Sequence, residues 1–223
     1  RDPEDAAFAF RRGAHEPGTK VLLGERFGEG LQEGERALDL LATHPSTARH
    51  VATRLATHFA GDHPPDSLVK RLQTVFLDTG GDLRALHRAL VEAPEPWDAM
   101  GSKLRTPVDL AAATARAFGH DPEGVDVLKV QTGLAQVPWG APSPKGWSDH
   151  TSAWMGPEAI LGRIELAEVV GERRYKRFTD PVAHAEGILG PLLTNATRTA
   201  IAQAPDGATG LALLHASPEF QRR

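Results

Sequence analysis

The sequence contains no cysteine among its 223 residues. This absence excludes disulfide bonds, thiolate catalysis, iron–sulfur clusters and zinc sites built on cysteine. It does not choose a compartment, because a cysteine-free chain suits the cytosol and the periplasm alike. Long apolar runs are also lacking: none approaches the roughly 18 residues needed to cross a bilayer, so we expect no membrane span. Residues 1–5 lack both an initiator methionine and the pattern of a signal peptide, which predicts a processed product or part of a longer chain.

An excess of basic residues is missing too. The chain has 25 Lys and Arg against 29 Asp and Glu, a formal charge of −4, whereas nucleic-acid-binding domains usually carry a basic excess. We therefore expect no nucleic-acid partner. The common catalytic motifs are absent as well: there is no zincin helix motif, no glycine-rich phosphate loop of the required spacing and no nucleophile elbow. Apolar residues make up 40% of the chain, as in an ordinary soluble globular domain.

What is present is a mainly helical pattern. Apolar residues recur at helical spacing, and start and stop signals delimit the segments. Residues 106–109 are typical of a helix start, with Thr106 as N-cap, proline at the first position and Asp109 facing the helix dipole. We expect helices near residues 45–60, 66–79, 82–93, 107–118, 124–135, 157–171, 181–193, 195–204 and 208–216. The predicted inward faces include Ala48, Val51, Ala52, Leu55 and Phe59, then Ile160, Leu161, Ile164, Ala167 and Val170.

Strand signals are confined to the beginning of the chain. Residues 8–12 and 19–23 flank a turn at 15–18, which predicts a β-hairpin. The predicted fold is therefore mainly α: a multi-helix bundle with a small N-terminal β-hairpin and a long loop rich in Trp, Pro and Gly. For the domains we expect a hairpin and lead-in over residues 1–30 and one continuous helical domain over residues 31–223.

The loop over residues 137–157 is the most unusual feature. It holds Trp139, Trp147 and Trp154 among interleaved prolines and glycines. Such rings can form a rigid platform that stacks on a sugar or grips a proline-rich peptide, with Asp149 and His150 giving polar direction. The alternative, slightly favoured, is that the rings cover the helical core where regular structure is lacking.

Three residues form a candidate site for a divalent metal ion. His15 and Glu16 lie in the predicted turn, and His44 precedes a proline-started helix. Imidazole and carboxylate ligands suit zinc, manganese or iron. The favoured alternative is that the first two cap the hairpin while His44 only fills its position. A second histidine ridge, His50 and His58, spans about two helical turns, too far for one shared metal, and is expected to be a solvated flank.

Several motifs, in order along nearly the whole chain, resemble the family named "domain of unknown function 1800". They are His15-Glu16-Pro17-Gly18-Thr19-Lys20, His44-Pro45-Ser46-Thr47-Ala48-Arg49-His50-Val51-Ala52, Gly80-Gly81-Asp82-Leu83-Arg84, Lys103-Leu104-Arg105-Thr106-Pro107-Val108, Gly146-Trp147-Ser148-Asp149 and Ser217-Pro218-Glu219-Phe220-Gln221. The resemblance covers what looks like the C-terminal half of that family, without its helical, Arg-rich N-terminal half. The chain departs from the pattern at Glu16, where Asp is usual.

The resemblance implies a bacterial, exported protein, periplasmic or secreted, encoded beside a sulfatase-like partner. It implies no reaction. Three functions stay open: a helical accessory or protein-interaction domain, whose partners are the sulfatase-like protein and the missing N-terminal part of its own chain; a metal-dependent enzyme using His15, Glu16 and His44; and a glycan- or peptide-binding module using the Trp-rich loop. The first is preferred, because no recognisable catalytic set is present.

Overall fold

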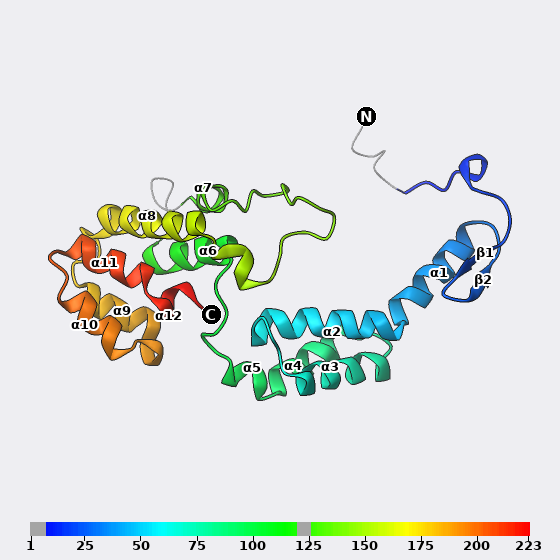
Figure 1. Ribbon diagram of the computed structural model, residues 1–223, viewed down its shortest axis with the longest axis horizontal. Coiled ribbons are helices and arrows are strands. Elements are labelled where there is room, and N and C mark those ends of the chain that lie inside the picture. The colour runs from blue at the N-terminus through cyan, green and yellow to red at the C-terminus, as the bar shows by residue number, and fades with distance from the viewer. Residues whose placement is uncertain (1–7, 120–125) are drawn as a thin grey trace. The chain divides into compact units, whose positions relative to one another are not determined.

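The computed structural model describes residues 8–119 and 126–223. It is mainly helical, with one short antiparallel hairpin near the N-terminus (Figure 1), so the predicted fold class is confirmed. The chain forms two compact units. The first lies within Arg1–Arg54 and Asp66–Glu92, and the second comprises Leu55–Pro65 and Ala93–Arg223. No helix in the described ranges is both long enough and apolar enough to span a bilayer.

The hairpin of the first unit begins later than predicted. Its strands are β1 (Lys20–Leu22) and β2 (Glu25–Phe27), with Lys20 paired to Phe27. Leu23 and Gly24 form the turn, both at positive φ, as a two-residue hairpin turn requires when its twist must match that of the strands. The predicted strand at residues 8–12 and the turn at 15–18 are therefore wrong. Residues 1–7 of the predicted lead-in lie outside the described residues.

Three helices of the first unit follow the predicted boundaries closely: the first part of α2 (Pro45–Ala60), α3 (Asp66–Asp78) and α4 (Leu83–Glu92). A further helix, α1 (Leu31–Thr43), was not predicted. α3 packs against α4. Between them Gly81, at a φ of 91°, donates its N–H to the carbonyl of Phe76 at 2.8 Å. A Cβ on Gly81 would lie 3.3 Å from the Phe76 ring, so this turn needs glycine for both its backbone and its packing.

The buried stripe of α2 is narrower than predicted. Ala48, Ala52 and Ala56 are fully buried, but Phe59 is half exposed. His58 is also not the solvated residue that was predicted. It is partly buried, and its Nδ1 lies 3.2 Å from a guanidinium nitrogen of Arg223. Burial, followed by the Arg223 charge, lowers the pKa of His58.

The second unit is built around the ring of Phe118. Its helices are α5 (Glu95–Asp98), α6 (Pro107–Phe118), α7 (Val127–Gly133), α8 (Pro157–Arg174), α9 (Pro181–Leu189), α10 (Asn195–Ala202), α11 (Gly207–Ala216) and α12 (Pro218–Gln221). Phe118 contacts the rings of Phe178, His184, His215 and Phe220. Leucines from α6, α9 and α11 complete this core, so helices distant in sequence share one apolar interior.

Local capping explains where these helices begin. Thr106 caps α6 as predicted, and its reciprocal hydrogen bonds with Asp109 complete a capping box. Thr194 caps α10. Asp126 caps α7, which begins at Val127. The predicted helix began at residue 124, and residues 124 and 125 lie outside the described residues. Each cap satisfies backbone N–H groups that the helix itself leaves without a partner.

The segment before α6 pairs with residues near the C-terminus. Lys103 and Arg223 exchange backbone hydrogen bonds, and the N–H of Arg105 donates to the carbonyl of Gln221 at 2.9 Å. Leu104 faces Arg222 in the bridge between them. This short antiparallel contact fixes α12 beside α6.

The inward face of α8 was only partly predicted. Ala167 and Val170 are buried, whereas Ile160, Leu161 and Ile164 are each about half exposed. The first half of α8 therefore presents apolar side chains that the core does not use. An apolar surface of this kind marks a candidate binding site.

Candidate functional site

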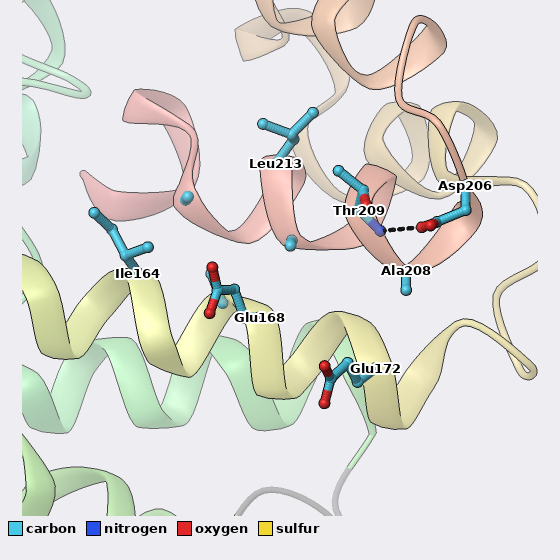
Figure 2. Close-up of a pocket in the computed structure, with 10 residues that line it drawn as sticks. Ile164, Glu168, Glu172, Asp206, Ala208, Thr209 and Leu213 are labelled. Carbon is cyan, nitrogen blue, oxygen red and sulfur yellow. Dashed lines mark hydrogen bonds between the residues drawn. The ribbon is translucent and has the colours of Figure 1, made fainter.

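A groove runs between α8 and α11, with a volume of about 430 Å³. It exists because small residues hold the two helices close together. A Cβ built on Gly171 would overlap the carbonyl oxygen of Ala208, and it would lie 3.2 Å from the Cβ of Ala212. Since glycine and alanine leave the flank of the contact unfilled, a depression remains beside it. We call this depression the acidic groove (Figure 2), and its labelled residues are Ile164, Glu168, Glu172, Asp206, Ala208, Thr209 and Leu213.

The acidic groove combines negative charge with apolar surface. Glu168 and Glu172 lie four residues apart on α8, so both are on the same helix face, and Figure 2 shows Ile164 and Glu168 rising from α8 toward α11. Both glutamates are exposed, and neither has an ion-pair partner within the described residues. Ile164 and Leu213 are also partly exposed. The site therefore fits a partner that carries both basic and apolar side chains.

Asp206 adds the third negative charge at the end of the acidic groove. Its carboxylate accepts a hydrogen bond of 2.7 Å from the N–H of Thr209, drawn in Figure 2, and so caps α11. Hydrogen bonds from the Thr209 backbone lower the pKa of Asp206. Its charge therefore persists to lower pH than that of an ordinary aspartate.

The Trp-rich loop forms a second hollow in the same unit. Trp147 and Trp154 lie together, with ring centroids 5.8 Å apart. Both line a pocket of about 460 Å³, with Pro142, Gly146 and Lys145 among its other residues. Trp154 is 5% exposed, and its Nε1 donates to the carbonyl of Ser148 at 3.0 Å, whereas Trp147 remains half-buried. Trp154 thus anchors the loop, and Trp147 is the ring available to a ligand.

The other predicted residues of the loop lie outside this pocket. Trp139 is fully exposed, at a φ of 60°, and does not line the pocket. Asp149 and His150 do not line it either. The negative charge of Asp149 acts instead on His58. It favours the protonated ring, but the larger effect of burial still lowers the pKa of His58 overall. The structure therefore brings together two of the five predicted ligand-binding residues, and their role stays a prediction.

Asp62 holds the end of the Trp-rich loop. One carboxylate oxygen accepts from the Nζ of Lys103 at 2.8 Å, and the other accepts from the N–H of Thr151 at 2.9 Å. Lys103 is almost completely buried. Although partial burial opposes it, hydrogen bonding to Lys103 and Thr151 lowers the pKa of Asp62 overall. A single carboxylate thus neutralises a buried ammonium group and positions the loop.

The three predicted metal ligands each take part in local contacts. His15 Nε2 accepts from the N–H of Gly30 at 3.2 Å, and His44 Nδ1 accepts from the N–H of Ser46 at 3.1 Å. The carbonyl of Glu16 accepts from Lys20. In residues 8–119 and 126–223 no three His, Asp or Glu side chains are grouped to hold a metal ion. A metal site at His15, Glu16 and His44 stays a prediction.

The profile of the family described as Protein of unknown function (DUF1800) matches residues 1–222. The chain belongs to this family. The match confirms the predicted resemblance and spans both units. No curated protein and no solved structure matches the chain.

Sequence reasoning missed the residues that build the acidic groove of this DUF1800 protein. Glu168 and Glu172 were not singled out, although two like charges four residues apart beside Ile164 were a visible signal. The close helix contact at Gly171 was not visible, because it depends on α11 lying against α8. Asp62 and Lys103, which fix the Trp-rich loop, are 41 residues apart and carried no local signal.

Proposed function

We propose that this protein is a helical accessory domain that binds another protein through the acidic groove between α8 and α11. The observation that carries the proposal is the combination of Glu168, Glu172 and Asp206 with exposed apolar side chains in one groove. The occupant we infer is a basic, amphipathic segment of a partner protein, since such a segment would both neutralise the carboxylates and cover Ile164 and Leu213.

We propose that the partner is the sulfatase-like protein that the family resemblance implies is encoded beside this chain. The same resemblance supports export from a bacterial cell, to the periplasm or the medium. Cell fractionation of the host with an antibody to this chain tests the compartment. Recovery from the cytosol alone would overturn the proposed export without bearing on the groove.

Binding to that neighbour is measured by isothermal titration calorimetry with both full-length proteins. Glu168→Lys combined with Glu172→Lys is expected to weaken the complex about tenfold or more, because it replaces attraction by repulsion at the rim. The affinity of the unaltered complex should also fall as salt is added, since exposed charges are screened.

Glu165→Lys is the matched control. Glu165→Lys changes the net charge by the same amount as each of the two groove substitutions. Because Glu165 is exposed on the same helix but does not line the acidic groove, this variant should bind like the unaltered protein. An unchanged affinity in the double variant would place the interface elsewhere. No complex between the two unaltered proteins would overturn the choice of partner.

A second candidate function is binding of a glycan or a proline-rich peptide in the Trp-lined pocket. It is favoured by the half-buried Trp147, which faces a pocket whose base, Trp154, is already fixed. Trp147→Ala should abolish binding on glycan and peptide arrays while the circular dichroism spectrum stays unchanged. Trp139→Ala is the control, since Trp139 does not line the pocket. Equal binding by both variants would reject this function.

A further inference from the structure

A separate cavity of about 410 Å³ lies between α8 and the segments near residues 102–104 and 216–222. Its apolar walls include Leu104, Met155, Ile160, Ile164 and Pro218. The volume falls within the range of about 300–1,000 Å³ that is usual for small-molecule pockets. Ile160 and Met155 are partly exposed, so the cavity opens to solvent. We call it the Arg163 cavity after the one buried charged residue in its wall.

Arg163 is a buried cation with no acidic partner among residues 8–119 and 126–223. Arg163 is only 6% exposed. Nη1 donates to the side-chain oxygen of Gln221 at 2.7 Å and Nη2 donates to the carbonyl of Arg105 at 2.8 Å. Both acceptors are uncharged. Nε is buried and has no hydrogen-bond partner within the described residues, so the guanidinium group has donors to spare.

No carboxylate of the described residues offsets that charge at the cavity. Among the described residues that line it, none is acidic, and Arg222 is a second cation. Asp109, an acid on α6, pairs instead with Arg223 and Thr106. Burial lowers the pKa of Arg163 to about 10, so the group still carries its charge at neutral pH. A buried charge without a counterion is costly, and a bound anion would remove that cost.

We propose that the Arg163 cavity binds an apolar monocarboxylate, such as a medium-chain fatty acid, with Arg163 as the counterion. The hydrocarbon chain would cover Leu104, Ile160 and Ile164, while the carboxylate would supply the negative charge that the cavity lacks. An uncharged lipid would gain only the apolar contacts, and a cationic one would be repelled by Arg163 and Arg222. This site is distinct from the acidic groove, although Ile164 and Ala216 border both.

The test uses the 223-residue chain and titration calorimetry with octanoate and octanol below their aggregation concentrations. Octanoate is expected to bind about tenfold or more tightly than octanol, because only the acid makes a charge-assisted contact. Hexanoate should bind about tenfold more weakly than octanoate, since it lacks two methylene groups that the walls would bury. Arg163→Gln should abolish the preference for the acid over the alcohol.

Two further variants keep the proposal falsifiable even where Arg163→Gln does not fold. Ile160→Trp fills the cavity from an exposed position and should remove octanoate binding. Leu161→Trp is its matched control, because Leu161 is the next residue of α8 and does not line the cavity, and it should bind normally. Equal affinity for octanoate and octanol, undetectable octanoate binding, or octanoate binding that survives Ile160→Trp would each overturn the proposal.

Discussion

The Nε2 of His215 lies 2.8 Å from the Oγ1 of Thr114, which precedes it by 101 residues. The hydroxyl of Thr114 already donates to the carbonyl of Leu110 at 2.7 Å. His215 must therefore be the donor to Thr114, so the proton of the neutral ring is on Nε2. Nδ1 is buried beside Phe118 and Phe220, without a hydrogen-bond partner in the described part of the chain.

This arrangement predicts loss of stability in mild acid. Burial, with smaller effects from Arg163 and Arg105, lowers the pKa of His215 from 6.5 to about 3. Above pH 6.5 neither the folded nor the unfolded state binds this proton. Below pH 6.5 the unfolded state takes it up while the folded state does not, so the free energy of unfolding falls from there toward pH 3, by up to about 1.4 kcal/mol per pH unit.

The measurement is urea unfolding between pH 7.5 and pH 4, compared with His215→Gln. Glutamine can donate to Thr114 but does not titrate, so its curve should lose stability less steeply as the pH falls. His58 and His184, whose pKa values are also lowered, add the same slope to both proteins. Parallel curves for the two proteins would contradict a neutral, buried His215.

Removing Asp62 should destabilise the second unit. Asp62→Ala leaves the buried Lys103 ammonium without its partner, at an expected cost of about 2–4 kcal/mol, allowing for the partial exposure of Asp62. The companion variant Asp62→Ala with Lys103→Met removes both charges and should recover much of that loss. Chemical denaturation of the four proteins of this double-mutant cycle gives the coupling energy, and additive effects would reject the ion pair.

The glycine at the contact between α8 and α11 should resist substitution. Gly171→Ala places a Cβ against the carbonyl of Ala208 and is expected to cost about 1–3 kcal/mol, the range for overpacked sites. Gly187→Ala is the matched control: Gly187 lies within α9 and has open space around it. It should stabilise the protein by about 0.5–1 kcal/mol. Thermal unfolding measures both changes, and equal effects would reject the close contact.

Two tryptophans of the same loop should behave differently. Trp154→Ala removes a buried ring and its hydrogen bond to Ser148, at an expected cost of about 3–5 kcal/mol. Trp139→Ala removes a fully exposed ring and should change stability by less than about 0.5 kcal/mol. The denaturation midpoints of the two variants, compared with that of the unaltered protein, measure both changes in stability. A large loss from Trp139→Ala would show that its ring packs against part of the protein.

Helix boundaries were predictable because capping is local. Thr106 and Asp109 indicate the start of a helix within four residues of sequence, and α6 begins there in the structure. The hairpin was misplaced because Leu23-Gly24 is not one of the usual turn pairs, while the signal at residues 15–18 was stronger. Apolar periodicity predicted which face of α8 is apolar. It did not predict how much of that face is exposed, because the core is filled by helices from distant parts of the chain.

The candidate sites were harder to predict than the fold. The Trp-rich loop was found by composition alone, yet which ring is buried depends on a contact between Trp154 and the Ser148 backbone. No sequence pattern indicated that Arg163 would be buried, because its hydrogen-bond acceptors come from the distant residues 105 and 221. Short sequence motifs therefore indicate local features such as caps and turns, whereas the lining of a cavity cannot be predicted from them, because it comes from segments that meet only after folding.

The backbone pairing of residues 103–105 with residues 221–223 bears on how the protein is made. These partners are separated by more than a hundred positions, so the bonds between them have high contact order and form late. During translation, the segment before α6 must wait for residues 221–223 to leave the ribosome before its backbone groups find their partners. Until then, the core around Phe118 lacks Phe220, and a nascent chain paused before that point exposes apolar surface for chaperones to recognise.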